Sequence, residues 1–177
     1  MTSDEGDAVT DTVLVPVTPD LHPVVERLWQ YYRHDLSEFR DSLPDEEGRF
    51  AVGPLAAYLA GQDGRTALLV RHGGHPAGFV LLRGTEAAPP ATIGEFFVVR
   101  AVRRRGVGYQ VATEVMRRSP GPWVVAFQEE NPRAARFWRR VATDLAGSSW
   151  TEQRIPVPDK PWLPPDVWLS LEVPPPG

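Results

Sequence analysis

The sequence predicts an α+β domain built around a mixed, mostly antiparallel sheet of about six to seven strands, flanked by about four helices. Two observations lead to this prediction. The first half of the chain contains short β-branched segments joined by a Gly-Gly pair, a pattern typical of antiparallel hairpins. The second half reads strand, helix, strand, helix, which predicts a crossover and one parallel pair of strands.

Length and composition favour one compact domain over residues 12–177, because 42% of the 177 residues are hydrophobic. Residues 1–11 are acidic and polar, so we expect a flexible leader and not a signal peptide. The net charge of -4 gives no bulk attraction to nucleic acid or to an anionic membrane, so neither is an expected partner. The absence of cysteine excludes disulfides and a cysteine nucleophile, and it fits a cytoplasmic protein.

The chain is expected to begin with an edge strand and a long helix. Residues 12–17 are β-branched and include a proline, which favours a place at the sheet edge. Thr18 or Asp20 is expected to cap a helix over residues 21–39, with Pro23 in its first turn.

A hairpin is the next predicted unit. It follows an acidic loop over residues 41–48 and a short helix over residues 54–60. The strands 66–71 and 76–83 are joined by Gly73-Gly74, and glycines allow the positive φ angles of a tight turn.

The second half is expected to hold a central strand, two helices separated by a strand, and a final antiparallel pair. The predicted ranges are 91–99, 108–118, 123–127, 131–144, 148–154 and 167–173.

The turn Arg103-Arg104-Arg105-Gly106-Val107-Gly108 lies between a predicted strand and a predicted helix. Its glycines expose backbone N–H groups, and the helix that follows adds a positive N-terminal dipole. Arginine side chains add charge, so the turn suits a phosphate or pyrophosphate. The alternative interpretation is a solvated basic turn that only caps a helix.

Two common nucleotide motifs do not fit this turn. A P-loop requires Gly-Lys-Ser/Thr after its spacer, which this sequence lacks. A dinucleotide fingerprint requires glycines directly after the strand and a small third position, but residues 100–105 intervene and Val111 occupies the third position. The pattern that remains is R-x-x-G-x-G.

With this turn, residues 91–141 resemble the GNAT superfamily of N-acetyltransferases, in which R-x-x-G-x-G holds the pyrophosphate of coenzyme A. The segment Asn131-Pro132-Arg133-Ala134-Ala135-Arg136-Phe137-Trp138 is similar to the family's N-x-x-A-x-x-F-Y segment, at the expected distance. The flanking strands match in order only. The resemblance implies a single GNAT-like domain whose central parallel strands splay apart, and acetyl-CoA as cofactor.

The resemblance also implies which residues bind the cofactor. Backbone groups of Phe97, Val98 and Arg100 are expected to hold the pantetheine arm and the thioester. Asn131 is expected to meet the pantetheine side, and Trp138 to pack beside it. The pyrophosphate is expected to bind Arg103, Arg104, Arg105, Gly106, Val107, Gly108 and Tyr109.

Glu95 is the candidate general base, because it is the only acid in an otherwise apolar or small strand segment. Desolvation there should raise its pKa toward the working pH, which suits removal of a proton from an amine. The alternative is a strand glutamate that faces an arginine or a backbone donor. Trp138 stands where the family commonly has a tyrosine, and indole cannot serve as a general acid.

The acceptor site is expected to involve Tyr31, Tyr32 and Asp35 of the first helix and Trp150 of the late hairpin. Acidic groups beside aromatic rings suit a cationic amine. An ordinary solvated helix face is the alternative. No metal site is expected, because His72 and His75 flank a turn without nearby acids.

The leading hypothesis is therefore transfer of acetyl from acetyl-CoA to a primary amine, in a small molecule or peptide, by direct attack in a ternary complex. A non-catalytic acyl-CoA-binding sensor or scaffold is the alternative. A third hypothesis, RNA or ribosome binding through residues 100–105, is disfavoured by the negative net charge. Family members often dimerise, so the resemblance allows a homodimer.

Overall fold

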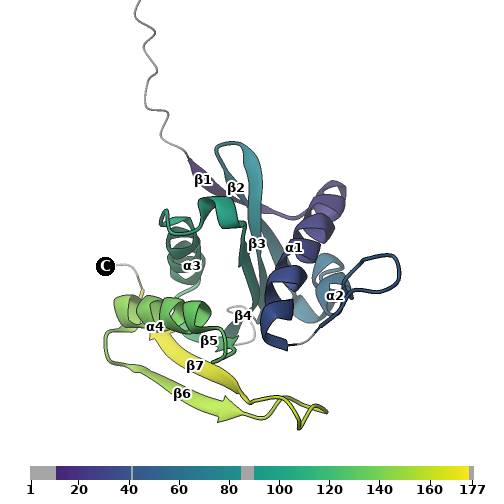
Figure 1. Cartoon of the computed structure of the whole chain (residues 1–177). Coiled ribbons are helices and arrows are strands. Elements are labelled where there is room, and N and C mark those ends of the chain that lie inside the picture. The colour runs from purple at the N-terminus through teal and green to yellow at the C-terminus, as the bar shows by residue number, and fades with distance from the viewer. Residues whose placement is uncertain (1–10, 41, 85–89, 176–177) are drawn as a thin grey trace, which may run out of the picture.

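The computed structural model describes residues 11–40, 42–84 and 90–175, so most of the predicted leader lies outside the described residues. A seven-stranded sheet has the order β1-β2-β3-β4-β5-β7-β6. Helices α1 and α2 cover one face, and α3 and α4 cover the other (Figure 1). The strands are β1 Thr12–Pro16, β2 Thr66–His72, β3 His75–Arg83, β4 Ala91–Val98, β5 Gly121–Phe127, β6 Trp150–Ile155 and β7 Asp166–Val173. The helices are α1 His22–Arg40, α2 Leu55–Leu59, α3 Val107–Arg118 and α4 Pro132–Ala146.

The α+β class and the mixed sheet are confirmed, and β1 lies at the sheet edge as predicted. The hairpin prediction is also confirmed. Gly73 and Gly74 have φ angles of 56° and 78°, so a two-residue turn joins β2 to β3.

The predicted cap by the Thr18 side chain is wrong. Its hydroxyl donates to Asp20 Oδ1 at 2.6 Å instead of accepting a backbone N–H. A short 3₁₀ turn, Pro19–Leu21, precedes α1, with Pro19 at its first position.

The splayed parallel pair is confirmed. Strands β4 and β5 pair only from Ala91 opposite Trp123 to Ile93 opposite Val125. Beyond this point β4 stays on β3 and β5 stays on β7, so the two central strands separate.

A β-bulge in β4 lies just past the last parallel contact. Leu81 is opposite Glu95 while Leu82 is opposite Ile93, so Gly94 is the extra residue. A Cβ built on Gly94 would lie 2.0 Å from the Tyr58 hydroxyl oxygen, which explains why glycine occupies this place.

Side chains alternate across β4 after the bulge. Phe97 belongs to the core beneath α1 and α2, whereas Phe96 and Val98 pack with the core beneath α3 and α4. Glu95 shares the α1 face with Phe97, because side chains two residues apart on a strand point the same way. The fold therefore brings Glu95 to α1 at the level where the sheet opens.

Candidate functional site

Along β4, the N–H and C=O groups of successive residues point alternately toward β3 and toward the β5 side. The N–H of Val99 donates to the Ala77 carbonyl at 2.8 Å, and Phe97 lies opposite Phe79. In an antiparallel pair this parity turns the N–H and C=O of Phe97 toward β3. The groups of Phe96 and Val98 then face the side from which β5 has diverged. The backbone groups of Phe97, which were expected to meet the cofactor, are therefore turned into the sheet, and those of Phe96 and Val98 face the opening.

The turn between β4 and α3 has the backbone of an anion site. Arg104 has φ 62° and Gly106 has φ 83°, so two residues of the turn adopt the left-handed backbone region. Helix α3 begins at Val107, and the N–H groups of its first turn have no partner within the helix. These donors and the helix dipole favour bound phosphate.

Asp35 of α1 binds two arginines of this turn. The Arg100 guanidinium donates to Asp35 Oδ1 at 2.6 Å, and the Arg103 guanidinium donates to Oδ2. Burial acts to raise the pKa of Asp35, but these hydrogen bonds outweigh it and leave the pKa below its ordinary value. Asp35 was predicted to meet the acceptor. In the structure its carboxylate ties α1 to the turn between β4 and α3.

Arg103 also touches β4, because its Nε donates to the Val98 carbonyl at 2.7 Å. Its guanidinium lies 5.5 Å from the centroid of the Phe97 ring. The Arg100 backbone was expected to bind the cofactor. Its carbonyl instead accepts the N–H of Arg103 at 3.2 Å within the local turn.

Glu95 and Tyr32 form the central pair of the site. The Tyr32 hydroxyl donates to Glu95 Oε2. The Tyr32 ring is held by aromatic neighbours, with centroids 5.3 Å from Trp29 and 5.6 Å from Phe79. Tyr32 was predicted to line the acceptor site, and the structure places its hydroxyl on the candidate base.

Burial raises the pKa of Glu95, and it does so despite the Tyr32 hydrogen bond and the positive charges of Arg33 and Arg83, which lower it. Burial, together with the adjacent carboxylate, raises the pKa of Tyr32 well above its ordinary value. The pair is therefore a phenol that keeps its proton beside a carboxyl group tuned toward proton transfer.

Helix α4 begins at this end of the sheet. The Asn131 side-chain oxygen accepts the Ala134 N–H at 3.1 Å, so it caps the helix and only its amide nitrogen is left for other contacts. Trp138 is 6% exposed and meets Phe96 and Phe137 edge-on, with centroids 5.2 and 4.8 Å away. Trp138 therefore packs in the core and carries no group that could donate a catalytic proton.

Two predicted acceptor residues, Tyr31 and Trp150, differ from Tyr32 in their surroundings. The Tyr31 side chain is 61% exposed. Trp150 is opposite Leu171, which is itself opposite Trp123 near the start of β5, and its indole N–H donates to Thr143 at 3.1 Å. Trp150 thus lies at the closed end of the parallel pair. Trp150 is therefore distant from Glu95, and a role of Tyr31 in acceptor binding stays a prediction.

Sequence reasoning missed a polar cluster opposite the second half of α1. Arg40 Nη2 lies 2.7 Å from Asp166 Oδ1, at the start of β7, and 3.6 Å from Glu130 Oε1, just after β5. Arg33 lies two turns before Arg40, on the same side of the helix. The seven-residue spacing of the two arginines could have shown that they share one side of α1. It could not have shown which strand ends they meet.

Other candidates do not form a site. His72 Nδ1 is 2.8 Å from the Thr12 hydroxyl, and the part of the chain that the structure describes has no group of three potential metal-binding side chains. In the same residues no helix is both long and apolar enough to cross a bilayer.

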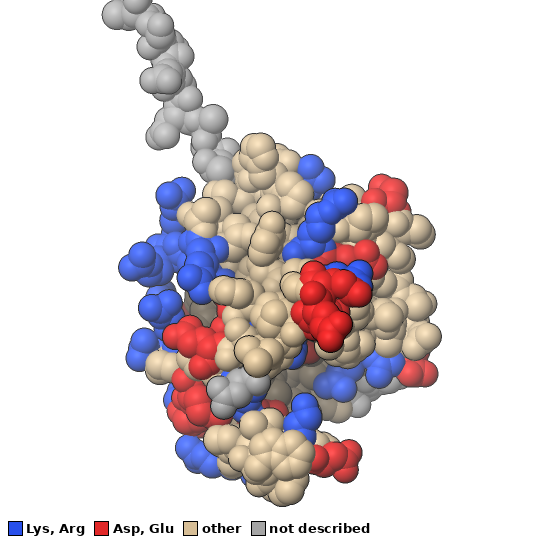
Figure 2. Space-filling view, turned by 45° about the vertical axis from the view of Figure 1, so that its right-hand side comes forward, with Lys and Arg blue, Asp and Glu red and all other residues tan. Residues whose placement is uncertain are grey.

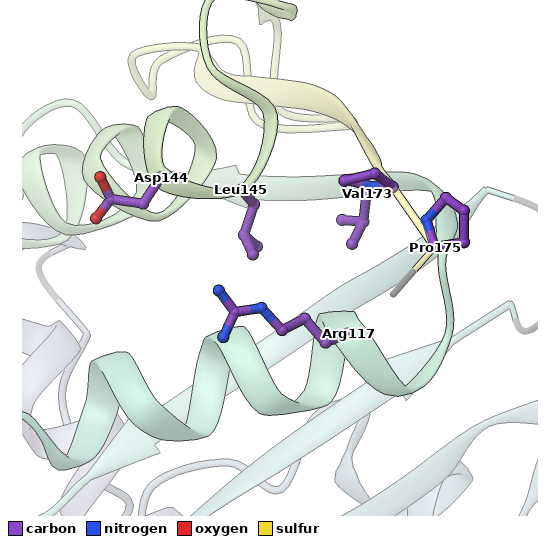
Figure 3. Close-up of a pocket in the computed structure, with 6 residues that line it drawn as sticks. Arg117, Asp144, Leu145, Val173 and Pro175 are labelled. Carbon is purple, nitrogen blue, oxygen red and sulfur yellow. The ribbon is translucent and has the colours of Figure 1, made fainter. Parts of the chain in front are cut away.

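A separate hollow lies between the C-terminal ends of α3 and α4 and the end of β7 (Figure 3). Residues 103–108 and Asn131 lie at the opposite, N-terminal ends of these helices. The length of α3 therefore separates them by roughly 18 Å. The residues that line the hollow are Arg117, Asp144, Leu145, Val173, Pro174 and Pro175.

Comparison with known proteins finds a family match. The sequence model of the acetyltransferase (GNAT) family matches residues 24–142, about two thirds of the chain and all of the site apart from Asp166. No curated protein sequence is significantly similar.

Solved structures share the fold at low identity. An acetyltransferase from Thermus thermophilus has a TM-score of 0.65 at 19% identity, over 93% of this chain and 99% of that one. A GCN5-related N-acetyltransferase from Rhodopseudomonas palustris has a TM-score of 0.61 at 17% identity, over 95% and 100%. A GNAT family acetyltransferase from Elizabethkingia anophelis, solved with acetyl-CoA bound, has a TM-score of 0.60 at 11% identity, over 92% and 98%.

Proposed function

The chain belongs to the GNAT acetyltransferase family, and from this premise we propose that it transfers acetyl from acetyl-CoA to a primary amine by direct attack in a ternary complex. One observation carries the proposal. The strand that separates from β5 holds Glu95 on one side and runs directly into an anion-binding turn. A thioester and its phosphates could therefore be held along one continuous segment, residues 95–109.

The residues fit the cofactor, which would supply the activated acetyl group. The backbone groups of Phe96 and the N–H of Val98 have no β5 partner, so they can pair with the amides of a pantetheine arm, whereas the Val98 carbonyl already accepts the Arg103 side chain. The N–H groups of residues 104–109 would hold the pyrophosphate. Figure 2 shows Lys and Arg gathered on the side where α3 and α4 lie, which favours the remaining phosphate. Exposed arginines of this side are Arg104, Arg105, Arg133, Arg136 and Arg140.

Glu95 would accept the proton of the attacking amine, directly or through water. Its raised pKa makes the carboxylate a stronger base than an exposed glutamate. Tyr32 would hold that carboxylate in place through its hydroxyl. Trp138 donates no proton, so the departing thiolate must be protonated by another group or by solvent.

Acetyl-CoA binding and amine turnover test the function together. We expect calorimetry to detect acetyl-CoA binding, and release of free coenzyme A thiol to accelerate with amines from a broad panel. Binding without turnover across the panel would favour the sensor function. Failure to bind at millimolar acetyl-CoA would refute both.

Removing the Tyr32 hydroxyl should shift the pH dependence of the reaction. The rate of a base-catalysed step rises as pH passes the pKa of Glu95, and the Tyr32 hydrogen bond lowers that pKa. In Tyr32→Phe the acidic limb of kcat/KM should therefore move to higher pH, with acetyl-CoA affinity preserved. Tyr31→Phe, which alters an exposed neighbour, is the matched control. An unmoved limb would show that Tyr32 does not set the protonation of the base.

A further inference from the structure

Both carboxylate oxygens of Asp35 accept hydrogen bonds from arginines of the turn between β4 and α3. The Arg100 guanidinium donates to Oδ1 through Nε at 3.0 Å and through Nη2 at 2.6 Å, and the Arg103 guanidinium donates to Oδ2. The Asp35 side chain is only 19% exposed, so these contacts form largely away from bulk water. Hydrogen bonds between charged groups in such a place are stronger than those between neutral groups.

The two arginines differ in how firmly they are held. The Arg100 side chain is 69% exposed, so solvent screens its contact with Asp35 and the contact contributes little. The Arg103 side chain is 35% exposed and has two further contacts. Its Nε donates to the Val98 carbonyl at 2.7 Å, and its guanidinium lies 5.5 Å from the centroid of the Phe97 ring. Arg103 is therefore the residue through which Asp35 can fix the turn.

Arg103 lies between the end of β4 and the proposed phosphate donors. Val98 is the last residue of β4, and Arg103 is the first residue of the R-x-x-G-x-G segment that leads into α3. Because the Arg103 side chain is bonded to both Val98 and Asp35, it limits how the turn can move relative to the strand. Donors that are already in place bind an anion more tightly than donors that must first be ordered.

The same side of α1 also contacts the proposed base. Tyr32 lies three residues before Asp35, so the two side chains project from one face of the helix. The Tyr32 hydroxyl donates to Glu95. One face of α1 thus contacts both ends of residues 95–103, the base through Tyr32 and the turn through Asp35.

We propose that Asp35 is a positioning residue for cofactor binding, which acts through Arg103 to hold residues 103–108 in the conformation that binds the phosphates. This inference rests on the proposed acetyl transfer and adds a residue to its cofactor site. In this role Asp35 touches neither the phosphates nor the reacting groups. Its negative charge by itself would repel phosphate, so positioning and charge repulsion predict opposite effects when Asp35 is neutralised.

Asp35→Asn tests this role with little change in side-chain size. Asparagine is uncharged and has one acceptor oxygen, so it cannot hold both arginines. We expect calorimetry to show binding of coenzyme A weakened by about tenfold. The KM for acetyl-CoA should rise by a similar factor, while kcat at saturating acetyl-CoA should stay unchanged because Tyr32 and Glu95 are retained. Glu38→Gln, an equal loss of charge at an exposed site one turn further along α1, is the matched control and should bind coenzyme A as the wild type does.

A double-mutant cycle tests whether Asp35 acts through Arg103. Arg103→Met removes the guanidinium, so in that background Asp35→Asn should have almost no further effect on the affinity for coenzyme A. A full tenfold loss in the Arg103→Met background would overturn the proposal. Arg103→Met also probes the contact from its other side, so the question is still decided if Asp35→Asn does not fold.

The remaining outcomes separate this inference from the proposed function. Unchanged or tighter binding of coenzyme A by folded Asp35→Asn would overturn the inference, because charge repulsion would then equal or outweigh positioning. A loss confined to kcat would also overturn it, since that result would assign Asp35 to the chemical step or to the acceptor. If the wild-type protein binds no coenzyme A, the proposed function fails and this inference fails with it.

Discussion

Gly108→Glu is expected to weaken acetyl-CoA binding by about a hundredfold or more. Gly108 is the second residue of α3, where unpaired N–H groups and the helix dipole should face the pyrophosphate. A carboxylate there would compete for the same donors and repel the phosphates. Calorimetry with acetyl-CoA measures the loss.

The same substitution should leave the fold intact, because an acidic side chain in the first turn of a helix is favourable. Gly108→Ala is the matched control. A Cβ at this position has Phe137 and Phe96 as its nearest neighbours at 3.7 Å, an ordinary contact, so alanine should bind acetyl-CoA almost as well as glycine does. If the glutamate variant kept wild-type affinity, the turn would not be the phosphate site.

Glu95→Gln is expected to reduce kcat by roughly a thousandfold, within the range that general base catalysis contributes. Glutamine keeps the size of the side chain and can still accept the Tyr32 hydroxyl, so acetyl-CoA affinity and thermal stability should be unchanged.

The pH profile separates a base from a merely structural residue. In the wild type, the acidic limb of the rate should lie above the ordinary glutamate range, because burial raises the pKa of Glu95. In the glutamine variant that limb should disappear. A variant with unchanged turnover and an unchanged limb would exclude Glu95 as the base and direct attention to another group.

Local features were predictable from the sequence. The Gly73-Gly74 hairpin, the helix after Gly106 and the helix that begins at Asn131-Pro132 depend on φ angles, caps and spacing within a few residues. The Thr18 side chain does not cap the helix, because its hydroxyl donates to the Asp20 carboxylate two residues away.

Contacts between segments that are distant in the sequence could not be predicted from short-range patterns. Asp35 was assigned to the acceptor from its helix face, yet its partners Arg100 and Arg103 lie 65 and 68 residues away. The parity that turns Phe96 and Val98 toward β5 depends on the register of β4 with β3, which a single strand does not encode.

The sequence by itself therefore determined the elements around residues 103–108, and it singled out this turn and Glu95 as the candidates for phosphate binding and proton transfer. Each depends on residue types at short spacing. Only the tertiary structure decided that Tyr32 meets Glu95, that Asp35 anchors the turn and that Glu130 faces Arg40. These contacts form when α1 packs across the opened sheet, and packing of distant segments is governed by the whole fold and not by local pattern.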